Sequence, residues 1–158
     1  MDSKDTAMTA SHSLMYSCEP SEPSSPAKTG NSSSLRILIV EDNRDHRKIL
    51  HTLLNSLGYV CREAANGSEG LNELRRSIFN LVMTDYQMPQ MNGIQFIHQV
   101  RTTQGLSAIP IIFMTGHSDP KVIDHARAVG ATSILLKPYS LEDLKTSLNL
   151  VWAMKKKP

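Results

Sequence analysis

The chain alternates five times between a short apolar run and a longer segment whose apolar residues have helical spacing. The apolar runs fall at residues 35–40, 59–61, 79–84, 110–114 and 132–136, the second being the weakest. Runs of this length are typical of strands buried on both faces of a sheet. The helical segments are expected at 49–57, 68–76, 92–101, 120–129 and 141–152. Repeated strand-then-helix units favour an α/β fold, a parallel sheet with helices on both faces.

The first part of the chain has a different composition. Residues 1–34 contain ten serines, three prolines, four acids and two bases, with almost no apolar periodicity. Such a segment buries too little apolar surface to offset its ordering entropy. We therefore expect a disordered Ser/Pro-rich tail over 1–34 and one folded domain over 35–158. A tether, a modification site and an unselected leader are all compatible with the tail.

Charge and cysteine content exclude several classes of protein. The formal net charge of +2 argues against direct nucleic-acid binding, which needs a denser basic patch. No apolar run approaches the roughly 18 residues of a membrane span, and the first residues lack a secretory signal. Two cysteines, Cys18 and Cys61, are too few for a disulfide scaffold. The expectation is a cytoplasmic protein without membrane contact.

Polar residues follow four of the expected strands. Glu41 and Asp42 follow the first, Asp85 the third, Thr115 the fourth and Lys137 the fifth. In open α/β sheets, ligands bind outside the carboxyl ends of the strands. These side chains are therefore expected to meet at one edge of the sheet.

The residue types suggest a particular chemistry. Three close carboxylates repel one another unless a cation joins them, and Mg²⁺ suits oxygen ligands at a phosphate site. One carboxylate could then act as a nucleophile toward a phosphoryl group. Asp85 is the best candidate, because its expected strand lies between the acidic pair and Thr115. A hydroxyl and an ammonium, from Thr115 and Lys137, could hold the phosphoryl oxygens.

Each of these residues also has a simpler interpretation. Asp42 or Asn43 could cap the first helix, Thr115 could be a turn residue, and Lys137 could lie in a solvated loop. Four independent strand ends that each supply a part of one site make the combined interpretation the better one.

Four motifs resemble those of the response-regulator receiver domains of two-component signalling. They are Ile37-Leu-Ile-Val-Glu-Asp42, Leu81-Val-Met-Thr-Asp-Tyr-Gln-Met-Pro-Gln-Met-Asn-Gly93, Ile111-Ile-Phe-Met-Thr-Gly116 and Leu135-Leu-Lys-Pro-Tyr139. The third-strand motif is the most specific of them. The resemblance implies a flavodoxin-like, doubly wound sheet of five strands in the order 2-1-3-4-5, with five helices.

The resemblance also implies a role for each site residue. Asp85 would accept a phosphoryl group from a phosphohistidine on a sensor histidine kinase or a histidine phosphotransfer protein. Asp42, Asp85 and the backbone carbonyl of Gln87 would bind Mg²⁺, with Glu41 acting through a metal-bound water. Thr115 would bind a phosphoryl oxygen, and Lys137, joined to Pro138 by a cis bond, would pair with the phosphate.

The sequence departs from the family at one position. Many receivers carry an aromatic residue three positions before the lysine, where this chain has Ile134. An aliphatic side chain cannot reproduce an aromatic swing between buried and exposed rotamers. Coupling between the site and the surface is therefore expected to differ from the usual pattern.

Two other protein classes fit the sequence less well. A haloacid-dehalogenase-type phosphatase would need an acid at position 87, and a nucleotide-binding enzyme a glycine-rich loop. His117, two residues after Thr115, could shape hydrolysis of the phosphorylated site, although an exposed loop histidine is the simpler interpretation.

Because no output domain follows the last helix, we expect signalling through an unidentified partner protein, or onward passage of the phosphoryl group in a relay. The chain would then be no enzyme beyond its own phosphorylation and dephosphorylation.

Overall fold

The computed structural model describes residues 35–155, so the expected tail over 1–34 and residues 156–158 lie outside the described part of the chain. Strands and helices alternate throughout this part of the chain. In order they are β1 (Arg36–Val40), α1 (Arg44–Ser56), β2 (Val60–Ala64), α2 (Gly67–Arg76), β3 (Leu81–Asp85), α3 (Gly93–Thr102), β4 (Ile111–Thr115), α4 (Pro120–Ala128), β5 (Ser133–Leu136) and α5 (Leu141–Lys155).

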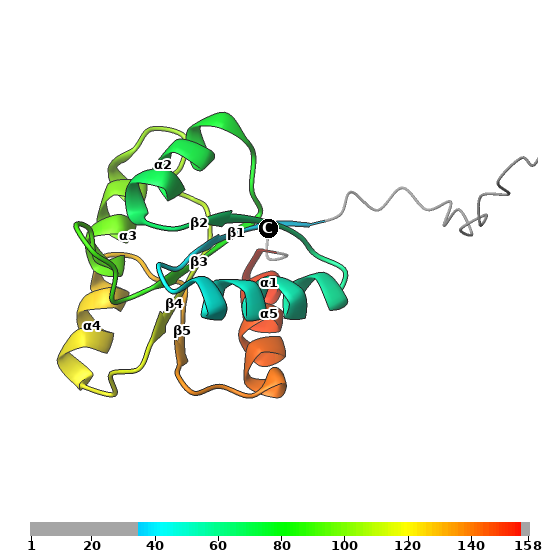
Figure 1. The fold of residues 1–158 in the computed structure, drawn as a ribbon. Helices are drawn as coiled ribbons and strands as arrows, with labels where there is room; N and C mark the ends of the chain where they lie inside the picture. The colour runs from blue at the N-terminus through cyan, green and yellow to red at the C-terminus, as the bar shows by residue number, and fades with distance from the viewer. Residues whose placement is uncertain (1–34, 156–158) are drawn as a thin grey trace, which may run out of the picture. The chain divides into compact units, whose positions relative to one another are not determined.

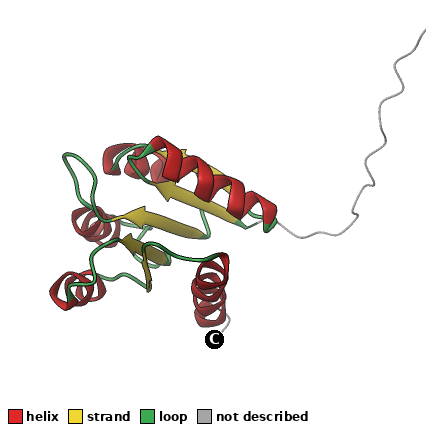
Figure 2. Cartoon of the chain, turned by 60° about the horizontal axis from the view of Figure 1, so that its bottom comes forward, coloured by secondary structure: helices red, strands yellow, loops and turns green. Residues whose placement is uncertain are grey.

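The five strands form one parallel sheet in the order β2-β1-β3-β4-β5, which confirms the predicted fold and strand order. Helices α1 and α5 lie on one side of the sheet, and α2, α3 and α4 lie on the other (Figure 1). Figure 2 shows the strands from a second direction, with helices around both faces. The strand order reverses between β1 and β3, which are neighbours in the sheet. A ligand is expected beyond the carboxyl ends of strands at such a reversal.

Apolar side chains of alternating residues fill both faces of the sheet. In β1, Ile37 and Ile39 pack in the layer beneath α1 and α5. Leu38 and Val40 pack in the opposite layer, beneath α2, α3 and α4. Because successive strand side chains point to opposite faces, a strand covered on both sides has to be apolar throughout. This requirement explains why the central strands appear in the sequence as continuous apolar runs.

Local capping fixes where the helices begin. The side chain of Asn43 accepts hydrogen bonds from the backbone N–H groups of Asp45 and His46 at the start of α1. Of the two candidate caps, Asn43 is therefore the residue that caps α1, and Asp42 is left for the site. Asn92 begins α3 through a reciprocal capping box with Gln95, a pattern that satisfies two otherwise unpaired backbone donors.

Each strand begins one or two residues later than predicted, and the boundaries of two strands differ most. Strand β2 extends to Ala64, three residues beyond the predicted run. Its second half was not predicted because Arg62 and Glu63 are exposed and polar, so they interrupt the apolar run. Strand β3 begins at Leu81 instead of residue 79. Phe79 is buried in the core although it precedes the strand, so its apolar side chain lengthened the run. Among residues 35–155, no helix has the length and apolar character needed to cross a membrane.

Candidate functional site

The polar residues predicted from the strand ends lie at one edge of the sheet. Glu41 and Asp42 follow β1, and Asp85 is the last residue of β3. Thr115 is the last residue of β4, and Lys137 follows β5 directly. The parallel arrangement brings all these strand ends to the same side, as expected from the sequence.

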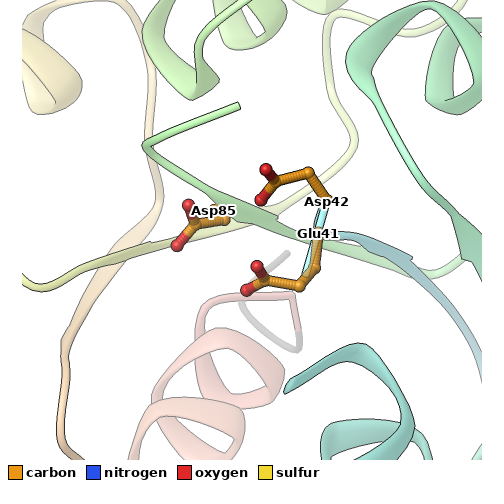
Figure 3. A group of neighbouring side chains, drawn as sticks. All are labelled: Glu41, Asp42 and Asp85. Atoms are coloured by element: carbon orange, nitrogen blue, oxygen red, sulfur yellow. The ribbon is translucent and has the colours of Figure 1, made fainter. Parts of the chain in front are cut away.

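The three acids form a compact cluster. Glu41, Asp42 and Asp85 each place one carboxylate oxygen within 4.8 Å of the others. In Figure 3 the side chains of Glu41 and Asp42 extend toward the side on which Asp85 lies. Glu41 and Asp85 are buried, with 2% and 6% of their surface exposed, whereas Asp42 is exposed. A cation could therefore reach the cluster from the Asp42 side.

Lys137 joins the two buried acids. Its Nζ donates to Oε2 of Glu41 at 2.7 Å and to Oδ1 of Asp85 at 2.6 Å. The bond between Lys137 and Pro138 is cis, as the resemblance implied. Burial by itself would lower the pKa of Lys137, but the hydrogen bonds to Asp85 and Glu41 outweigh it and raise the pKa. The side chain of Lys137 therefore keeps its positive charge at the site.

Burial raises the pKa of Glu41, whereas burial alone would lower that of Lys137. Removal from water raises the pKa of its carboxyl, and the nearby Asp85 adds to the increase, while the hydrogen bond from Lys137 lowers it. The backbone N–H of Asn43 also donates to Oε1 of Glu41, at 3.2 Å. Glu41 is thus held by two donors, one on each carboxylate oxygen.

Asp85 is positioned by its own loop and by a close backbone approach. The backbone N–H of Gln87 donates to Oδ2 of Asp85 at 2.7 Å. The backbone N–H of Gly93 donates to the carbonyl of Tyr86 at 2.8 Å. A Cβ on Gly93 would lie 2.2 Å from the backbone oxygen of Asp85. The glycine in the third-strand motif therefore lets α3 pack directly against the end of β3.

Thr115 is fully buried, and its hydroxyl faces its own loop. The backbone N–H of His117 donates to Oγ1 of Thr115 at 3.0 Å. The turn interpretation of Thr115 and the site interpretation are thus both compatible with its position. The ring of His117 extends toward the β3 side, where its Nε2 lies 2.8 Å from the side-chain nitrogen of Gln87.

The link between Gln87 and His117 could not be predicted from the sequence. The two residues are thirty positions apart, and no spacing pattern connects them. The only signal was that each lies two residues after a predicted site residue. His117 is exposed, as expected for a loop histidine, but it is engaged with a neighbouring loop.

The site opens into a hollow of about 340 Å³ that is lined by the acid cluster together with Asn43, His46, Gln87, Gly116 and Lys137. Three carboxylates against one ammonium leave an excess of negative charge at its base. Oxygen ligands with this excess suit a hard divalent cation such as Mg²⁺. The residues present therefore fit a magnesium site.

Ile134 lies on β5, where it pairs in register with Phe113 of β4. Its side chain is half-buried and packs against the core layer on the α4 side. The position that carries an aromatic residue in many receivers is thus occupied by a packed aliphatic side chain.

Comparison with known proteins agrees with this geometry. A probable chemotaxis protein CheY from Rhizobium etli is 30% identical over 119 residues, which cover 75% of this chain and 92% of the relative. The transcriptional regulatory protein ZraR of Escherichia coli is 32% identical over 115 residues, or 73% of this chain, but the match spans only 26% of that longer protein.

Solved structures show the same similarity. The chemotaxis protein CheY4 of Vibrio cholerae superimposes with a TM-score of 0.72 at 31% identity, covering 75% of this chain and 99% of the other. The signal receiver domain of a signal transduction histidine kinase from Syntrophus aciditrophicus gives a TM-score of 0.71 at 28% identity, covering 79% and 96%. Residues 37–149 match the family described as the response regulator receiver domain. With the parallel sheet and the acid cluster at its edge, this match shows that the chain belongs to the response-regulator receiver domain family.

Proposed function

We propose that this protein is a phosphorylation-dependent response regulator in which Asp85 is the phosphoacceptor. The observation that carries the proposal is the environment of Asp85. Its carboxylate is buried at the end of β3, one oxygen is held by the Lys137 ammonium and the other by the Gln87 N–H. Two further acids complete a cluster that could hold a cation.

The phosphoryl donor is a phosphohistidine of a sensor histidine kinase or of a histidine phosphotransfer protein. A carboxylate oxygen of Asp85 attacks the phosphorus, a P–O bond forms, and the P–N bond to the donor imidazole breaks. The imidazole leaves with the electron pair of that bond and takes up a proton. The product is an acyl phosphate on Asp85, and the protein promotes only its own phosphorylation and dephosphorylation.

Asp42, Asp85 and the backbone carbonyl of Gln87, together with Glu41, would hold Mg²⁺ at this edge of the sheet. The bound ion supplies positive charge that offsets the carboxylates and the incoming phosphoryl oxygens. Lys137 already contacts Asp85 and pairs with the added charge. The hydroxyl of Thr115 donates a hydrogen bond to a phosphoryl oxygen.

The domain exists in resting and active arrangements, and the charge of the phosphoryl group shifts the equilibrium between them. The shift between them can be no larger than the difference in interaction free energy that the phosphoryl group makes with the two states. Thr115 and Lys137 supply that difference, because both can contact the phosphoryl group in the active arrangement. The active arrangement then binds a downstream partner protein.

The test is to incubate the full chain with Mg²⁺ and a small acyl phosphate donor and to map the added phosphate by mass spectrometry. We expect hydroxylamine-sensitive phosphate on the peptide that contains Asp85. Asp85→Asn should carry none, because the amide has the same shape but cannot form an acyl phosphate. Stoichiometric hydroxylamine-sensitive phosphate on that variant would show that another carboxylate is the acceptor.

A further inference from the structure

His117, in the loop after β4, makes one contact with the end of its own strand and two with the loop after β3. Its backbone N–H donates to the hydroxyl of Thr115 at 3.0 Å. Its ring Nε2 lies 2.8 Å from the side-chain nitrogen of Gln87, so the amide donates and the ring accepts. Its ring also meets Tyr86 edge-on, with centroids 5.7 Å apart and an interplanar angle of 86°.

These contacts restrain Thr115 in particular. Thr115 is fully buried, and its hydroxyl accepts from the same residue whose side chain is held on the β3 side. A move of Thr115 toward Asp85 changes its contact with the His117 N–H and displaces the start of the loop. Because the contacts with Gln87 and Tyr86 fix the place of His117, a shift of Thr115 either moves His117 against these contacts or breaks the hydrogen bond from the His117 N–H.

Tyr86 connects the bridge to the core. Its ring lies 5.5 Å from that of Phe113, which is fully buried in β4 and pairs in register with Ile134. The aromatic chain from His117 through Tyr86 to Phe113 thus runs beside the position where this protein has Ile134.

We propose that His117 is a latch, a positioning residue whose bond to Gln87 holds Thr115 and its loop in the resting arrangement until Asp85 is phosphorylated. The inference rests on the proposed function of Asp85 and names a restraint within it. A restraint present only in the resting state lowers the apparent affinity for any ligand that selects the active state. Breaking the latch should therefore tighten the binding of a phosphoryl analogue, whereas a residue that supports the phosphorylated site would weaken it when removed.

The experiment measures the affinity of the full chain for beryllium fluoride, a tetrahedral phosphoryl analogue, at fixed saturating Mg²⁺ by calorimetry or NMR titration. The variants are His117→Ala, Gln87→Ala, their double variant and His117→Phe, with His98→Ala as the matched control. Gln87→Ala keeps the backbone carbonyl and removes only the side chain. His98 is an exposed histidine on α3 that takes no part in the bridge.

We expect His117→Ala and Gln87→Ala each to tighten analogue binding by about threefold to tenfold, as for the loss of one net hydrogen bond. The double variant should bind no more tightly than either single variant, because both remove the same bond. His117→Phe keeps an aromatic edge against Tyr86 and should still behave as His117→Ala. The control should match the wild type.

Unchanged or weaker binding by His117→Ala would overturn the latch, as would additive effects of the two single substitutions. Wild-type affinity in His117→Phe would show that the contact with Tyr86, not the bond to Gln87, is the restraint, and would likewise overturn it. Failure of the proposed function gives a different result. If the wild type takes up neither acyl phosphate on Asp85 nor the analogue, the phosphoacceptor assignment itself is wrong.

Discussion

Lys137 determines the electrostatics of the resting site at the scale of single residues. Among residues 35–155, its ammonium is the one group that hydrogen-bonds to both Glu41 and Asp85, and its side chain is 22% exposed while that of Glu41 is 3% exposed. The sequence predicted that Lys137 would lie near Asp85. It did not predict the bond to Glu41, because that contact depends on the rotamers of residues ninety-six positions apart.

The Lys137→Ala variant should still accept phosphate on Asp85, but phosphorylation should cause a smaller conformational change in it. The substitution leaves the buried Glu41 carboxylate without its charged partner, which we expect to cost about 1–3 kcal/mol of unfolding free energy. Phosphorylation-dependent changes in amide shifts over residues 131–139 should shrink sharply, since the variant cannot form the ion pair between Lys137 and the phosphoryl group. The full wild-type shift pattern in the phosphorylated variant would mean that the change runs through Thr115 alone.

Asp42→Ala should weaken Mg²⁺ binding by at least about tenfold, since loss of a direct ligand should cost no less than loss of a group that orients one. The exposed acid lies in the cluster with Glu41 and Asp85, whose mutual repulsion a cation relieves. Asp45→Ala is the matched control, an exposed acid in the first turn of α1 outside the cluster. Calorimetric titration of both variants with Mg²⁺ distinguishes the loss of a metal ligand from the loss of one negative charge near the site. Equal affinities in the two variants would remove the metal role from Asp42.

At the scale of elements, burial decides which parts of the fold could be predicted. Strands β3 and β4 are buried along their whole length, so their sequences are apolar runs that mark them clearly. Strand β2 lies at the edge of the sheet and carries exposed Arg62 and Glu63, so only part of it was predicted. The ends of the buried strands could also be predicted, because the apolar runs stop there. Hydrogen bonds between loops, such as that of Gln87 and His117, could not be predicted, because they do not depend on hydrophobic periodicity.

Gly93→Ala should disturb the junction of β3 and α3. The new Cβ would lie 2.2 Å from the backbone oxygen of Asp85, and backbone cannot swing aside as a side chain can. We expect a loss of about 1–3 kcal/mol in unfolding free energy, the usual cost of overpacking, together with weaker Mg²⁺ binding.

Gly116→Ala is the matched control for this substitution. It adds the same atom in the loop after β4, where nothing lies within 4 Å of the new Cβ. Chemical denaturation should show a clear difference between the two variants. Equal stability would mean that α3 shifts away from β3 without cost.

At the scale of the whole molecule, two apolar layers on either side of one sheet supply the stability. Their buried members all lie between Ile37 and Val151. The last turns of α5 belong to this core, because Val151 is buried and Trp152 donates from its indole nitrogen to the hydroxyl of Tyr59 at 3.0 Å. Residues 1–34 are rich in serine and proline and have almost no apolar periodicity, so their composition does not predict an element that could join either layer.

We therefore expect the chain without residues 1–34 to fold and to unfold with the same midpoint and the same denaturant dependence as the full chain. The slope of unfolding free energy against denaturant follows the surface exposed on unfolding, and this deletion removes no part of the described core. Deleting residues 151–158 is the contrasting truncation. It removes far fewer residues but takes away Val151 and Trp152, and should cost at least about 2–5 kcal/mol, as for loss of one large core side chain. Circular dichroism during urea unfolding measures both variants. A lower slope or midpoint after deletion of 1–34 would show that the first segment packs on the domain and that the boundary at residue 35 is misplaced.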